Sequence, residues 1–73
     1  MSPEARREHV MEVSKLYARC RWEGDPGRHA RCYVEGVFQH LPADVLEEGI
    51  RHGARSYRAK YEAVTTIDQR PTF

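Results

Sequence analysis

Residues 23–27 have the sequence Glu-Gly-Asp-Pro-Gly, and this stretch divides the chain. Two glycines, a proline and an aspartate in so short a stretch do not continue a helix or a strand. On both sides of it, hydrophobic side chains recur at the three- and four-residue spacing of an amphipathic helix. The sequence therefore predicts two separate helices joined here by a short loop.

The segment before this break carries a helix start and a hydrophobic stripe. Ser2 can cap free amides, Pro3 suits a first helical position, and Glu4 faces the positive end of the helix dipole. We predict a helix over about residues 3–21. Its stripe consists of Val10, Val13, Leu16, Tyr17 and Cys20.

The segment after the break predicts a second amphipathic helix over residues 28–40. Gly36 is a weak point, because glycine costs about 1 kcal/mol relative to alanine inside a helix. A strand through Cys32-Tyr33-Val34 is the alternative, since aromatic and branched side chains cluster there. The stripe consists of Ala30, Tyr33, Val34, Val37, Phe38 and Leu41.

Leu41-Pro42-Ala43-Asp44 predicts a second break and a new helix start. One continuous stripe follows it and predicts a helix over about residues 43–65, with Gly49 and Gly53 as candidate bends. Residues 66–73, which include Pro71, are expected to form an irregular tail. The stripe consists of Val45, Leu46, Ile50, Ala54, Tyr57, Tyr61 and Val64.

Three amphipathic helices with short connections predict a mainly α fold, a small single-domain bundle of about three helices over residues 1–73.

Composition and hydropathy indicate where in the cell the protein resides. The chain carries 12 Lys+Arg against 11 Asp+Glu, and no more than three hydrophobic residues follow one another. A membrane span needs about 20 apolar residues, and the first seven residues lack the apolar stretch of a signal peptide. We expect a cytoplasmic, monomeric protein without membrane contact.

The most informative segment is Arg51–Tyr61, where no acid occurs between Glu48 and Glu62. On a helix its arginines form a ridge beside two tyrosines, and Arg and Tyr are enriched at interface hot spots. A smaller group of basic and aromatic residues surrounds the first break. A solvated helix face is the alternative for the ridge. The predicted partner-binding residues are Arg51, Arg55, Tyr57, Arg58, Lys60, Tyr61, Arg21 and Trp22.

Residues for catalysis or metal binding are sparse. The serines at 2, 14 and 56 have no recognisable nucleophile motif around them. Glu47 and Glu48 are adjacent, so on a helix they point about 100° apart and cannot share a proton. We expect no enzyme activity and no cofactor.

Cys20, His29 and Cys32 lie around the first break, with His9 and His40 as further candidate ligands. They lack the paired short spacings of a structural zinc site. A disulfide between the cysteines across the loop is a second alternative. We favour Cys20 as a small hydrophobe that continues its helix stripe.

In its length, its lack of a catalytic motif, its ten arginines against two lysines and its Arg/Tyr segment at 51–61, the chain resembles a group of small bacteriophage proteins. These are the phage-encoded regulators that bind bacterial RNA polymerase in the host cytoplasm. The resemblance implies a protein that binds polymerase subunits and inhibits or redirects transcription without chemistry of its own. The alternatives are a DNA-binding, helix-turn-helix-like regulator, with residues 41–44 as the turn, and a zinc-stapled interaction module.

Overall fold

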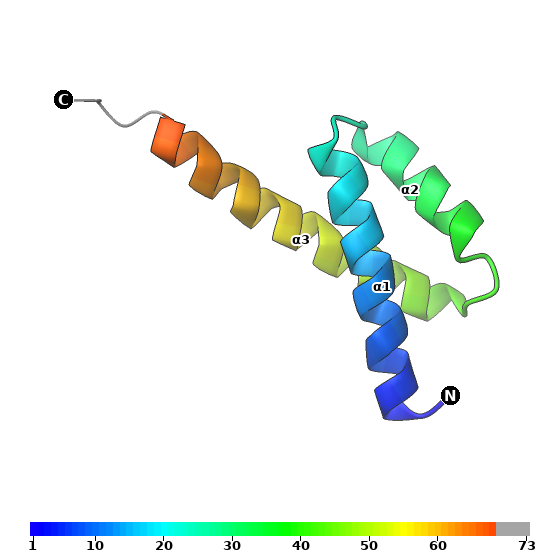
Figure 1. The fold of residues 1–73 in the computed structure, drawn as a ribbon. Coiled ribbons are helices and arrows are strands. Elements are labelled where there is room, and N and C mark those ends of the chain that lie inside the picture. The colour runs from blue at the N-terminus through cyan, green and yellow to red at the C-terminus, as the bar shows by residue number, and fades with distance from the viewer. Residues whose placement is uncertain (69–73) are drawn as a thin grey trace.

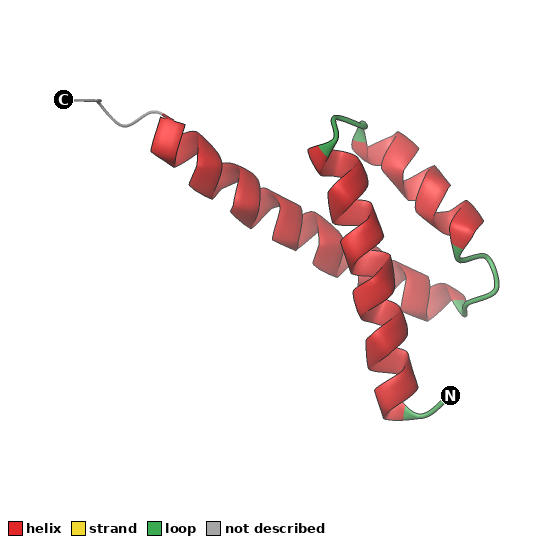
Figure 2. Cartoon of the chain, viewed as in Figure 1, coloured by secondary structure: helices red, strands yellow, loops and turns green. Residues whose placement is uncertain are grey.

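The computed structural model describes the backbone of residues 1–68 and the side chains of residues 1–63. It contains α1 (Pro3–Trp22), α2 (Gly27–Val37) and α3 (Ala43–Asp68) (Figure 1). Short loops join them, and no strand occurs among the described residues (Figure 2). The predicted mainly α bundle is confirmed, and the alternative strand at Cys32–Val34 is wrong because these residues lie within α2. None of the described helices is both long and apolar enough to cross a bilayer.

α1 begins and ends on local signals. The Ser2 hydroxyl accepts a hydrogen bond from the Ala5 N–H at 3.1 Å, as expected of a capping residue. At the other end Gly24 adopts a positive φ of 105°. The Gly24 and Asp25 N–H groups then donate to the carbonyls of Arg21 and Cys20, which completes the hydrogen-bond pattern that commonly closes a helix at glycine.

α2 is shorter than predicted and buries less of its stripe. It ends at Val37, directly after Gly36, because the Phe38 backbone (φ −107°, ψ 29°) leaves the helical region. Ala30 and Val34 are fully buried, whereas Tyr33 and Val37 are 51% and 44% exposed. α2 packs mainly against α1. One neighbour covers only a narrow part of a helix, so the edges of the predicted stripe remain open.

α3 is longer than predicted, because it continues to Asp68. The predicted irregular tail is therefore wrong for residues 66–68. No glycine or proline interrupts the chain between Gly53 and Pro71, so nothing local stops the helix before the residues that precede that proline. The rest of the predicted tail, residues 69–73, lies outside the described residues.

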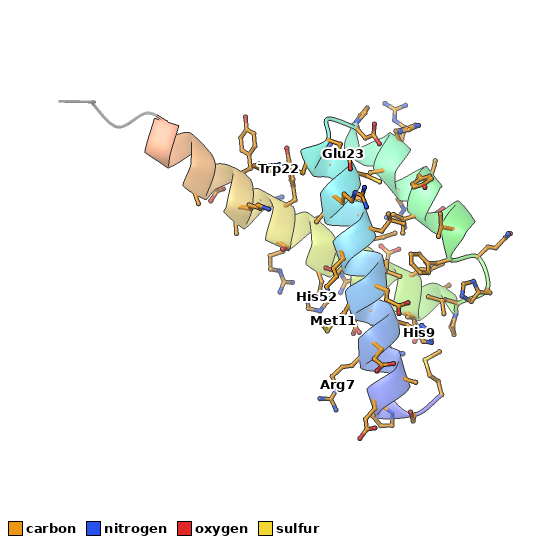
Figure 3. All side chains as sticks on the ribbon, in the orientation of Figure 1. Arg7, His9, Met11, Trp22, Glu23 and His52 are labelled. Atoms are coloured by element: carbon orange, nitrogen blue, oxygen red, sulfur yellow. The ribbon has the colours of Figure 1, made fainter. Side chains whose placement is uncertain are left out.

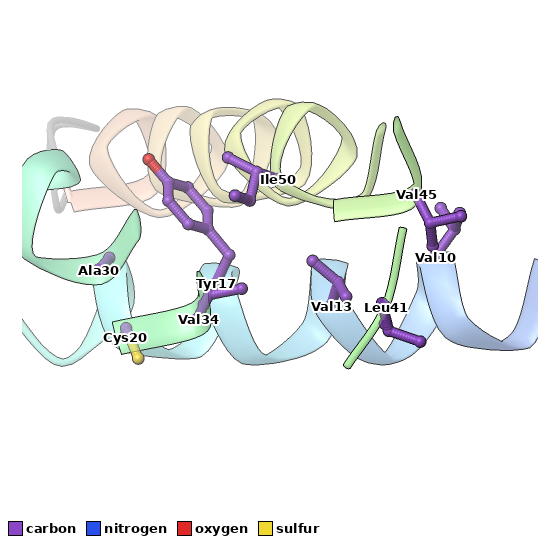
Figure 4. Packing of buried hydrophobic residues seen from close by; sticks show 9 residues of the cluster. All are labelled: Val10, Val13, Tyr17, Cys20, Ala30, Val34, Leu41, Val45 and Ile50. Atoms are coloured by element: carbon purple, nitrogen blue, oxygen red, sulfur yellow. The ribbon is translucent and has the colours of Figure 1, made fainter. Parts of the chain in front are cut away.

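The core lies mainly where α1 crosses α3, with α2 on one side (Figures 1 and 4). It is made of small and branched side chains and one tyrosine. Among the described residues no polar or charged side chain is buried. The buried hydrophobic residues are Val10, Val13, Tyr17, Cys20, Ala30, Val34, Leu41, Val45 and Ile50.

Gly49 and Gly53 lie buried at this crossing. A Cβ atom on Gly49 would stand 2.5 Å from the Cβ atom of Val13, and one on Gly53 would stand 2.7 Å from the carbonyl oxygen of Ser14. Both separations are shorter than carbon and oxygen atoms tolerate. The two glycines, which the sequence offered as candidate bends, are therefore the points at which α3 approaches α1 most closely.

Among the described side chains, ion pairs from Arg6 and Arg31 connect α3 to the other helices. The Arg6 guanidinium donates to the Asp44 carboxylate at 2.7 Å and links α1 to the start of α3. Arg31 pairs with Glu47 and links α2 to the same turns of α3. The hydrogen bond from Arg6 holds the pKa of Asp44 below its usual value. The first turns of α3 are thus tied to both neighbouring helices.

Candidate protein-binding face

The second half of α3 projects beyond the other two helices (Figure 1). The molecule measures 53 × 25 × 13 Å along its principal axes, and residues 58–63 are all exposed. We call residues 55–68 the projecting part of α3. Helices of this length owe most of their stability to packing of one face. Among the described residues, Arg21 and Trp22 contact this part of α3 at its base.

Aromatic and basic side chains gather at the base of the projecting part. The Trp22 and Tyr57 rings meet edge to face, with centroids 6.2 Å apart. Lys60 Nζ lies 5.1 Å from the centre of the Trp22 ring. The Tyr57 and Tyr61 centroids are 5.8 Å apart. We call these residues, with Arg21, the aromatic–basic cluster.

Arg21 is held in this cluster by contacts on both sides of its guanidinium. Its Nη1 donates to the Asp25 carbonyl oxygen at 3.1 Å, and its Cζ lies 4.9 Å from the centre of the Tyr57 ring. Cation–π contacts of this kind contribute about 0.5–1 kcal/mol at exposed sites. The loop after α1 therefore positions a charged group over the aromatic surface of α3.

Large hydrophobic surface remains open in the cluster. Trp22 is 43% exposed and Tyr61 is 52% exposed, whereas Tyr57 between them is half-buried. Hollows of about 300 and 480 Å³ lie on the two sides of Tyr57. The first is lined by Trp22 and Lys60, and the second by Arg21, Arg58 and Tyr61 among others. The cluster can thus accept side chains of a partner on either side of Tyr57.

The predicted arginine ridge is only partly beside the cluster. Arg51 and Arg55 each lie two residues from Gly53, so they point about 200° away from the side of α3 that contacts α1. Only Arg58 lines a hollow together with Tyr57 and Tyr61. The structure thus unites most of the predicted partner-binding residues and leaves Arg51 and Arg55 on the opposite side of α3.

The ridge arginines have no acidic partner among the described side chains. Arg51, Arg55 and Arg58 are exposed, and none has a carboxylate oxygen within 4.0 Å there. The arginines that do form such pairs are Arg6, Arg19 and Arg31. Arg19 and Arg31 are therefore less available to a partner than the ridge.

The cysteines lie in different environments. Cys20 is buried on the stripe of α1, as predicted, and Cys32 is exposed on α2; both are free thiols. Burial, together with the charges of Asp25 and Glu23, raises the pKa of Cys20, which favours the neutral thiol that packs as a hydrophobe. Within the part of the chain that the structure describes, no group of three His, Cys, Asp or Glu side chains could hold a metal ion.

The adjacent carboxylates Glu47 and Glu48 form ion pairs with arginines of the neighbouring helices. Glu47 pairs with Arg31, and a Glu48 oxygen lies 3.7 Å from Arg6 Nε. Their surroundings are those of ion pairs between helices, and they offer no proton-sharing arrangement.

Sequence reasoning missed one face altogether, on the side of the α1–α3 crossing away from α2. Met11 is 55% exposed there and lines a hollow with Arg7 and His52. Met11 directly follows Val10 of the buried stripe, and successive residues of a helix point about 100° apart. This position outside the stripe was a signal in the sequence that an apolar side chain would face solvent.

The chain matches no protein-family model, no curated protein and no solved structure. The functional inference therefore rests on the aromatic–basic cluster.

Proposed function

We propose that this protein is a non-enzymatic binding protein whose aromatic–basic cluster and Arg58 dock on an acidic protein surface. The observation that carries the proposal is the base of the projecting part of α3, where cations and partly exposed aromatic rings meet Arg21 and Trp22 and leave hydrophobic surface open.

The chemistry of the cluster suits a protein partner. Tryptophan, tyrosine and arginine dominate the energetic centres of protein interfaces, because each combines a large surface with directed hydrogen bonds. Arginine in addition binds carboxylates through two parallel hydrogen bonds. Contacts among Arg21, Trp22, Tyr57 and Lys60 already order these side chains. Less side-chain entropy is then lost when a partner binds.

Bacterial RNA polymerase is the first partner to test. The resemblance to phage-encoded polymerase regulators supports this choice. In this proposal the chain binds a polymerase subunit and inhibits or redirects transcription by occupying its surface.

DNA recognition through a helix-turn-helix is less well supported. Such a motif inserts the first turns of its second helix into the major groove. Here the first turns of α3 carry Asp44, Glu47 and Glu48, and Val45 and Ile50 of the same segment are buried. Carboxylates at that position would repel phosphates. We therefore favour protein over DNA.

The test is capture by the immobilised chain, with purified bacterial RNA polymerase and with nuclease-treated bacterial lysate. The double variant Arg21→Glu/Arg58→Glu reverses two charges that line the same hollow beside Tyr57. It should weaken binding by about 30-fold, which corresponds to roughly 2 kcal/mol for residues at an interface centre. Arg28→Glu is the control, because Arg28 is also exposed but lies on α2. Circular dichroism verifies that each variant is folded.

The outcomes separate the hypotheses. A protein that the wild type and Arg28→Glu retain, and that the double variant loses, supports the proposal. Equal retention by the folded double variant rejects this face. Binding that nuclease treatment abolishes supports a nucleic-acid partner in its place.

A further inference from the structure

α2 covers only one side of the pair formed by α1 and α3. On the other side lie Arg7, Met11, Trp22 and His52 (Figure 3). Two hollows of about 300 and 430 Å³ follow this side, and they share Ser14 and Ser56. They are therefore adjacent, and we call the two hollows together the uncovered groove.

The lining and the length of the uncovered groove suit a bound helix. Its floor contains the small side chains of Ser14, Ala18 and Ser56, which let another backbone approach closely. Met11 stands at one end and Trp22 at the other. They are separated by eleven residues of α1, or about 16 Å at 1.5 Å per residue. Three turns of a partner helix span this distance.

The charges at the rim of the groove are mostly positive. Arg7, Lys15 and Lys60 line it, and within the described side chains none of them has a carboxylate oxygen within 4.0 Å. The acid in the groove, Glu48, lies 3.7 Å from Arg6. A second copy of this groove would bring like charges together, which disfavours self-association through it. The unpaired cations favour an acidic occupant.

We infer that the uncovered groove binds an acidic amphipathic helix of a partner protein. Apolar side chains spaced along one face of that helix would contact the row from Met11 to Trp22. Its carboxylates would pair with Arg7, Lys15 and Lys60, in the manner of helices that lie in grooves. This inference rests on the proposed function and names the class of surface that the partner presents.

Trp22 gives a direct readout, because it is the single tryptophan of the chain and lines the groove. Two synthetic helical peptides of about 18 residues, or five turns, serve as probes. Both carry the same leucine stripe, flanked by glutamates in one peptide and by lysines in the other. We expect a saturable change in Trp22 emission with the glutamate peptide, and binding at least tenfold weaker for the lysine peptide.

Matched variants locate the binding. Met11→Glu places a carboxylate in the groove and should weaken binding of the glutamate peptide at least tenfold. Val37→Glu is the control at a comparably exposed apolar position of α2, and it should leave the affinity for this peptide unchanged. Lys15→Glu gives a second test at an exposed position and should also weaken binding at least tenfold.

The inference is overturned if neither peptide changes Trp22 emission, if the lysine peptide binds as well as the glutamate peptide, or if both groove variants bind like the wild type. Failure here remains distinct from failure of the proposed function. A groove without peptide affinity, in a chain whose Arg21→Glu/Arg58→Glu variant loses its captured protein, refutes only the groove. Peptide binding with an unaffected double variant refutes only the proposed docking surface at the aromatic–basic cluster and Arg58.

Discussion

At the crossing of α1 and α3, Gly49 and Gly53 bring two backbones to a separation that a methyl group would prevent. The nearest atom to a Cβ on Gly49 belongs to Val13, which is itself fully buried. Such an atom cannot move aside without disturbing the core. The cost of two glycines inside a helix is therefore offset by close packing of the helices.

A glycine-to-alanine pair tests this interpretation. Gly49→Ala should lower the free energy of unfolding by about 2 kcal/mol, because overpacking of a core outweighs the better helix propensity of alanine. Gly36→Ala should raise it by about 0.5–1 kcal/mol, since a Cβ there meets nothing within 4 Å. Urea unfolding followed by circular dichroism measures both. Stabilisation of equal size at the two positions would show that the crossing is wider than described.

The hydrogen bond between Arg6 and Asp44 predicts that the folding stability of the chain depends on pH. The hydrogen bond from Arg6 lowers its pKa in the folded chain, so the folded state keeps this carboxylate ionised at pH values where the unfolded state takes up a proton. The stabilisation is complete above the unfolded pKa of about 3.9. It is lost as the pH falls through the lower, folded value.

Asp44→Asn should therefore lower the melting temperature slightly at pH 7, and the difference from the wild type should shrink towards zero as the pH falls through the lowered pKa of Asp44 in the folded chain. Both partners are exposed, so added salt should reduce the effect. Glu8→Gln, an exposed change on α1, is the control. Melting curves at pH 7 and at acidic pH check this, and a difference that persists unchanged in acid would contradict the role of the pair.

At the level of the helices, hydrophobic periodicity predicted all three elements, because each helix buries one stripe. Periodicity did not predict the C-terminal ends of α2 and α3. α2 stops after Gly36 through a local backbone change at Phe38, and α3 continues to Asp68 because no breaker precedes Pro71. Periodicity also cannot state how many neighbours cover a helix, which is why Tyr33 and Val37 are exposed despite lying on the predicted stripe.

The candidate site was predictable in its residues but not in its arrangement. Arg21 and Trp22 stood out as basic and aromatic groups near a loop, and Tyr57 and Lys60 as part of a separate segment. Their contact depends on how α1 crosses α3, which is decided by packing of distant residues at Gly49 and Gly53. The position of Arg55, in contrast, follows from local spacing, because two residues of a helix separate it from Tyr57 and correspond to about 200°.

Proline substitutions test whether the projecting part of α3 is independent of the core. Ala59→Pro should reduce helix content, because proline removes a hydrogen bond and clashes with the preceding turn at a cost of about 3 kcal/mol. Unfolding of the remaining core should change little, since residues 58–63 are exposed. Ala54→Pro, packed against the core, should unfold the chain. Circular dichroism and urea unfolding distinguish them, and equal loss of stability in both variants would show that the projecting part supports the core.

The whole molecule combines a small core with an extended helix. Its radius of gyration is 14.3 Å, whereas a compact domain of this length has about 11 Å. The described residues include nine buried hydrophobic ones, several of them small, so the folding stability of the chain should be low. A partner that covered the projecting part of α3 and the uncovered groove would supply the missing neighbour, and it would stabilise the folded chain by mass action.

Small-angle X-ray scattering tests this shape in solution. The isolated chain should give a radius of gyration of about 14 Å or more, because the hydration layer adds to the value of 14.3 Å, with a tail in the distance distribution near the 53 Å length of the molecule. A value close to the compact 11 Å would mean that the projecting part of α3 folds back on the core. The aromatic–basic cluster would then be covered within the chain, and the docking surface proposed above would not exist in the free protein. Ala59→Pro serves as the comparison, because a broken helix should shorten the distance distribution while the core remains folded.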